Sequence, residues 1–128
     1  MMKIVVFGLS VSSSWGNGHA TLWRGLIKGL ARRGCRVVFF EKDVSYYAGA
    51  RDLCEIPNGR LVLYPEWQQV RGDALRETAS SDVAIVTSYC PDGIAATELV
   101  LSSAPSLKLF YDLDTPVTLA RIEEGEAL

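Results

Sequence analysis

The chain has 128 residues, of which 48% are hydrophobic and 22% charged, and its formal net charge is −2. This length and composition are typical of a single globular domain with a core of its own. The weak negative charge gives no electrostatic support to a nucleic-acid partner. No apolar run approaches the roughly 20 residues of a membrane span.

The N-terminus runs straight into an apolar segment without a cleavage-like site, so we expect no signal peptide. The three cysteines, Cys35, Cys54 and Cys90, are odd in number and lack C-x-x-C spacing. This pattern indicates reduced thiols in a cytoplasmic protein. With one histidine and no cysteine pair, the sequence gives no basis for a zinc site.

The first predicted element is a buried strand over residues 3–9, because this stretch is a nearly continuous run of Ile, Val, Phe and Leu. A loop rich in serine and glycine follows over residues 10–20. Residues 21–33 then have the apolar spacing of an amphipathic helix. Gly25 and Gly29 inside this helix predict that its backbone packs closely on the sheet. The expected apolar stripe consists of Leu22, Trp23, Leu26, Ile27 and Leu30.

Strands and helical segments alternate along the rest of the chain. Further strands are expected at residues 35–42, 61–64, 82–89 and 107–113. Helical segments are expected at residues 44–52, 67–80, 91 to about 103, and from 115 onward. Five such alternations predict an α/β fold with a parallel, doubly wound sheet. The expected strand order is 3-2-1-4-5, with a ligand crevice between strands 1 and 4.

The loop after the first strand is the first candidate site. Gly16 and Gly18 permit positive φ and close approach of a ligand, and the start of the following helix favours an anion or a polar oxygen. His19 stands at that helix start and is a candidate general base, because histidine titrates near neutral pH. The alternative is a histidine that caps the helix or holds the loop in shape.

Acidic residues supply further candidates after the later strands. Asp92 is expected to cap the helix that follows strand 4, and Asp114 the helix that begins at Thr115. Asp112 remains open as a catalytic or hydroxyl-binding group. Alternate residues of a strand point to opposite faces, so at most one of Asp112 and Asp114 need face a ligand.

A dinucleotide-binding domain is an alternative interpretation. Glu41, at the end of strand 2, has the position of the acid that binds a ribose hydroxyl in such domains, although it is equally an ordinary charged strand end. Thr21 stands where the third glycine of the fingerprint would be. No Gly-Lys-Ser/Thr follows the glycines, which excludes a P-loop.

Three segments carry a more specific pattern: SSSWGNGHAT at residues 12–21, Ser88-Tyr89 with Pro91-Asp92-Gly93, and FYDLDTPVTL at residues 110–119. Together they resemble bacterial glycosyltransferase-like proteins of the GT-B fold, above all the CgeB-type spore-maturation group. In that fold two Rossmann-like domains face each other across a cleft. The N-terminal domain mainly binds the acceptor, and the C-terminal domain mainly binds the nucleotide-sugar donor.

The resemblance implies that residues 1–128 form the N-terminal, acceptor-side domain of a glycosyltransferase, inactive without a donor domain. Its donor would be a nucleotide-diphosphate sugar and its acceptor a sugar or other hydroxyl compound, with no metal and no covalently bound cofactor. A stand-alone nucleotide- or sugar-binding module is the alternative. The face toward the missing domain, which carries Trp15 and Tyr89, is expected to be able to self-associate. The candidate catalytic residues are His19 and Asp112, and the candidate substrate-binding residues are Ser14, Trp15, Gly16, Asn17, Gly18, Ser88, Tyr89, Asp92, Asp114 and Thr115.

Overall fold

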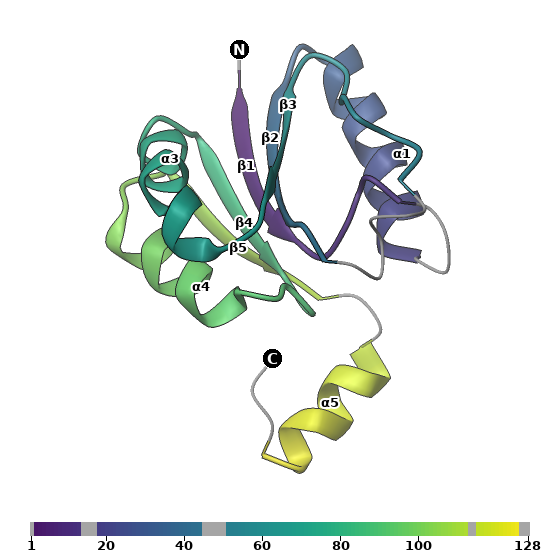
Figure 1. Cartoon of the computed structure of the whole chain (residues 1–128), viewed down its shortest axis with the longest axis vertical. Helices are drawn as coiled ribbons and strands as arrows, with labels where there is room; N and C mark the ends of the chain where they lie inside the picture. The colour runs from purple at the N-terminus through teal and green to yellow at the C-terminus, as the bar shows by residue number, and fades with distance from the viewer. Residues whose placement is uncertain (1, 14–17, 45–50, 113–114, 126–128) are drawn as a thin grey trace.

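The computed structural model of the chain describes residues 2–13, 18–44, 51–112 and 115–125. Its centre is one parallel five-stranded sheet with the order β3-β2-β1-β4-β5, which confirms the predicted fold class and strand order (Figure 1). The strands are β1 (Lys3–Gly8), β2 (Arg36–Lys42), β3 (Arg60–Tyr64), β4 (Val83–Thr87) and β5 (Leu107–Tyr111).

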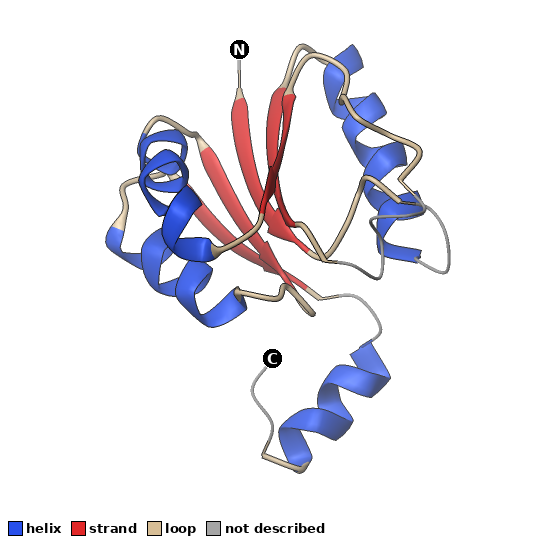
Figure 2. Ribbon diagram, viewed as in Figure 1, coloured by secondary structure: helices blue, strands red, loops and turns tan. Residues whose placement is uncertain are grey.

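Helices cover the sheet on both faces, as Figure 2 shows. Helix α1 (Gly18–Arg32) lies on one face, and α3 (Trp67–Ala79) and α4 (Gly93–Ser102) lie on the other. Helix α5 (Thr115–Glu123) stands apart from the sheet, beyond the carboxyl ends of the strands. This end of the sheet is called the carboxyl edge below.

The core explains why the strands are apolar without alternation. Val5 and Phe7 of β1 face α3 and α4, and the Phe7 ring stacks on Phe40 at 5.0 Å. Ile4 and Val6 face the opposite side, where they share a buried cluster with Trp23 of α1. A strand covered on both faces needs apolar side chains at every position.

Three expectations for α1 are wrong. The helix begins at Gly18, three residues earlier than predicted, and its buried side consists of His19, Ala20, Trp23 and Ile27. Leu22 and Leu26 of the predicted stripe are exposed. A Cβ added at either glycine in the middle of the helix would meet nothing within 4 Å, so no close backbone packing requires these glycines.

The other predicted element boundaries differ less from those in the structure. Strands β4 and β5 each end two residues before the predicted position, at Thr87 and Tyr111. The helix predicted over residues 44–52 lies mostly outside the described residues. In the part of the chain that the structure describes, no helix is both long and apolar enough to cross a membrane.

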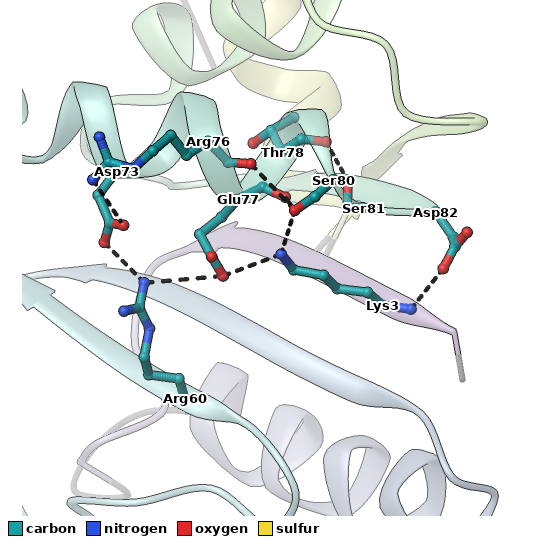
Figure 3. A network of polar contacts seen from close by, with 9 residues as sticks. All are labelled: Lys3, Arg60, Asp73, Arg76, Glu77, Thr78, Ser80, Ser81 and Asp82. Carbon is teal, nitrogen blue, oxygen red and sulfur yellow. Dashed lines mark hydrogen bonds and ion pairs between the residues drawn. The ribbon is translucent and has the colours of Figure 1, made fainter.

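A network of polar contacts fastens α3 to the amino ends of β1 and β3 (Figure 3). Arg60 of β3 contacts Asp73 at 2.8 Å and Glu77 at 3.9 Å. The Lys3 ammonium of β1 lies 3.3 Å from Glu77 and donates to the Ser80 hydroxyl at 2.6 Å. These contacts hold the amino ends of β1 and β3 against α3, at the end of the sheet opposite the carboxyl edge.

Candidate functional site

A cavity of about 570 Å³ opens at the carboxyl edge beside the end of β4. The β4–α4 loop, the first turns of α4 and one residue of α5 form its walls. Its polar side chains include Asp92, Glu98 and Arg121. The complete lining is Tyr89, Cys90, Pro91, Asp92, Gly93, Ile94, Ala95, Glu98 and Arg121.

Tyr89 joins three distant parts of the chain at this cavity. Its φ of 63° lies in the left-handed region, which is rare for a residue with a side chain and turns the chain sharply after β4. The ring meets His19 of α1 edge to face at a centroid distance of 5.9 Å. The Arg121 guanidinium of α5 lies over the same ring at 4.8 Å, a cation–π contact.

Asp92 stands at the N-cap position of α4, but its side chain makes no capping hydrogen bond, so the predicted capping role is wrong. Its Oδ2 instead accepts a hydrogen bond from the Tyr64 hydroxyl at 3.0 Å. The Lys42 ammonium lies 3.8 Å from the same oxygen. Asp92 therefore ties the carboxyl ends of β2 and β3 to the start of α4.

Burial is the main cause of the raised pKa values of the two weak acids beside Asp92, Cys90 and Tyr64. It is the main cause that raises the pKa of Cys90 to about 12, and the Asp92 charge adds to this. The backbone hydrogen bond at Asp92 acts in the opposite direction but does not outweigh burial. Burial also raises the pKa of Tyr64, with smaller contributions from Cys90 and Asp92. The thiol is therefore protonated at neutral pH and is no nucleophile, while the Tyr64 hydroxyl keeps its proton for Asp92.

The structure brings the segment after β1 and the loop after β4 together only in part. His19 touches Tyr89 but is 7% exposed and is absent from the cavity lining. Ser88 is buried, and its N–H donates to the Tyr111 carbonyl at 3.0 Å. Asp112 is half-buried just after β5. Of the other predicted site residues, Gly18 begins α1 and Thr115 begins α5, whereas Ser14, Trp15, Gly16, Asn17 and Asp114 lie outside the described residues.

Glu41 fits neither interpretation considered from the sequence. Its fully buried carboxylate accepts hydrogen bonds from the N–H groups of Val11 and Ser12, at 2.7 and 3.0 Å, and from the Ser12 hydroxyl at 2.6 Å. Arg51 donates to the same hydroxyl at 3.1 Å. The acid thus fixes the start of the loop after β1, so both its oxygens are already engaged and a ribose would have to displace these contacts.

Sequence reasoning missed several residues around the cavity. Lys42 ends β2, and the carboxyl ends of parallel strands meet at one edge, so its proximity to Asp92 could have been predicted. Glu98 and Arg121 follow the start of their helices by about one and a half turns. No local motif marks either residue.

Comparison of the chain with protein-family models, with curated proteins and with solved structures finds no match. The fold is Rossmann-like, and no family is identified.

Proposed function

We propose that the chain is the acceptor-binding domain of a nucleotide-sugar-dependent glycosyltransferase, with the acceptor in the cavity at the carboxyl edge. The observation that carries the proposal is the position of this cavity, at the end of β4 and between α4 and α5. Its volume of about 570 Å³ is within the usual range for small-ligand sites. The sequence resemblance to GT-B enzymes supplies the reaction class.

The polar groups of the cavity suit a neutral, hydroxyl-rich ligand. The carboxylates of Asp92 and Glu98 accept hydrogen bonds from hydroxyls, and the Arg121 guanidinium donates to ring or hydroxyl oxygens. With the Lys42 ammonium beside Asp92, the positive and negative charges at the cavity nearly cancel, which suits a neutral ligand better than a diphosphate. This charge balance supports an acceptor in the cavity and a donor held elsewhere.

In the proposed reaction an acceptor hydroxyl oxygen attacks the anomeric carbon of the donor sugar. The bond to the diphosphate oxygen breaks, the nucleoside diphosphate leaves, and the hydroxyl proton passes to a base. His19 remains the proposed base. Its ring is one side chain away from the cavity, in contact with Tyr89, so the step requires Tyr89 to move.

A sugar-binding module without turnover is the second candidate. The burial of His19 favours it, because no histidine is among the residues that line the cavity. This candidate needs the same cavity and the same polar groups but no second domain.

Calorimetric titration of the chain with neutral sugars and with nucleotide sugars tests the shared part of both proposals. We expect neutral sugars to bind, and Glu98→Gln to weaken binding about tenfold. Glu123→Gln, at an exposed position outside the cavity, is the matched control. Absence of sugar binding, or equal binding by Glu98→Gln, contradicts the site.

A product assay with radiolabelled nucleotide sugars separates the two candidates. The chain alone should give no product, because transfer needs the donor positioned against the acceptor, which supplies roughly 7–11 kcal/mol of the barrier. Turnover by a longer form with a second domain supports the glycosyltransferase. Binding without turnover by such a form supports the module.

A further inference from the structure

Strand β5 is an edge of the sheet with apolar side chains on both of its faces. It is the last strand in the order β3-β2-β1-β4-β5. Leu107 and Leu109 share the face of Val83 and Ile85, their partners in β4, whereas Phe110 shares the opposite face with Val86. All three β5 side chains are exposed, Phe110 by 54%.

The main chain of β5 has hydrogen-bonding groups directed to the open side. Leu107 donates to the Asp82 carbonyl at 3.0 Å, and the Tyr111 carbonyl accepts from Ser88 at 3.0 Å. Alternate residues of a strand direct their N–H and C=O groups to opposite sides. The main-chain N–H and C=O groups of Lys108 and Phe110 therefore point away from β4, toward the open edge.

Charge does not protect this edge. Natural edge strands often carry an outward lysine that blocks pairing with another chain. Lys108 is the one charged residue of β5, and its ammonium donates to the Leu101 carbonyl at 3.1 Å, near the end of α4. The charge is thus directed over the chain's own helix rather than beyond the strand.

We infer that β5 pairs antiparallel with β5 of a second copy of this chain, about a two-fold axis through Leu109. The axis sets Lys108 opposite Phe110 of the second copy, and Phe110 opposite its Lys108. These two pairs form four main-chain hydrogen bonds. Leu109 lies opposite Leu109 of the second copy, and no two charges of the same sign lie opposite each other.

A second copy fits this edge because identical strands are self-complementary only in such a two-fold arrangement. The axis is perpendicular to the sheet, so the face covered by α4 continues into the same face of the second copy. Leu101, exposed on α4, extends the apolar surface beside Phe110. The result is one ten-stranded sheet, and the carboxyl-edge cavity is not part of the contact.

The test is sedimentation equilibrium over a concentration series, with folding checked by circular dichroism. We expect the wild type to reach the mass of two chains. Leu109→Lys should have the mass of one chain, because two lysines then face each other across the axis. The matched control is Leu63→Lys in the other edge strand, since Leu63 is 39% exposed and Leu109 43%; it should remain a dimer.

A mixture of Leu109→Lys with Leu109→Glu tests the register. Each variant alone should be monomeric, and the mixture should form a dimer because opposite charges then meet. A monomeric wild type, a dimeric Leu109→Lys, a monomeric Leu63→Lys, or a mixture that stays monomeric overturns the inference.

Phe110→Pro gives an independent result if the charged variants do not fold. The Phe110 N–H points away from β4, so proline leaves the contacts with β4 in place and removes two of the four hydrogen bonds between copies. We expect dimer affinity to fall at least about tenfold. Unchanged affinity overturns the inference.

Discussion

The two edge strands, β3 and β5, have the same length and nearly the same apolar content, yet side chains of β3 make more polar contacts with neighbouring elements than those of β5. Arg60 of β3 makes ion pairs with Asp73 and Glu77 of α3. Tyr64, at the other end, is buried and donates to Asp92. Four of the five β5 residues are exposed outright.

The difference shows that the contacts a strand makes with neighbouring elements, and not its apolar content, decide how firmly it is held. β-propensity describes how well a side chain fits a half-buried surface, and the sequences RLVLY and LKLFY fit one equally well. We therefore expect substitutions on the β3 side to cost more stability than matched ones near β5.

The largest loss of stability is expected for Glu41→Ala, in the strand next to β3. It removes the buried acceptor of two backbone N–H groups and one hydroxyl. Unfolding in urea should show a loss of about 4 kcal/mol. Glu41→Gln keeps an acceptor oxygen and should lose about 1 kcal/mol. Equal losses would contradict the role of this carboxylate in holding the loop.

Gly59→Ala, directly before β3, should cost about 3 kcal/mol. A Cβ at this position would lie 2.0 Å from the Val37 carbonyl oxygen, which is backbone and cannot move aside cheaply. The counterpart before β5 is Ser106→Ala, at an exposed position, which should change the free energy of unfolding by less than about 0.5 kcal/mol. Thermal unfolding of both variants gives the comparison, and similar melting temperatures would refute it.

Alkaline pH should lower the free energy of unfolding through the buried Cys90 thiol of the β4–α4 loop. The Cys90 thiol has a pKa of 9.0 when unperturbed and about 12 in the folded protein. Its contribution is complete below about pH 9 and is lost as the pH rises toward 12, because only the unfolded chain releases the proton in that interval. The loss is about 1 kcal/mol at pH 10.

Cys90→Ala should remove this part of the pH dependence, and Cys54→Ala, at an exposed cysteine, should not. Tyr64 lowers stability in the same direction above its own unperturbed pKa of 10.0, so both variants keep some dependence at higher pH. Identical profiles for wild type and Cys90→Ala between about pH 8 and pH 10 would contradict the assignment.

The smallest effect concerns the one charged residue of each edge strand. Arg60→Ala loses two ion pairs that are partly exposed and should cost about 0.7 kcal/mol. Lys108→Ala loses one exposed hydrogen bond and should cost less than about 0.3 kcal/mol. Parallel urea titrations at low and high salt measure both, and only the Arg60 effect should shrink with salt.

The sheet could be predicted because its three central strands are buried on both faces and read as continuous apolar runs, as in residues 3–8. The start of α1 was missed because the predicted stripe began at Leu22, whereas Ala20 and Trp23 form the buried side. The site was harder to predict. Tyr89 adopts positive φ without a glycine, and the Glu41 contacts join residues 30 positions apart. Such contacts leave no periodic signal.

The strand order also has a consequence for synthesis of the chain on the ribosome. The central strand β1 emerges first, but its second neighbour, β4, follows only after roughly 75 further residues, which is about 4–15 s of translation. During that interval β1, β2 and β3 can already pair, and one side of the central strand β1 stays open. Binding of chaperones to the nascent chain should therefore be strongest before β4, which begins at residue 83, has left the exit tunnel. It should decline once β4 has left the tunnel.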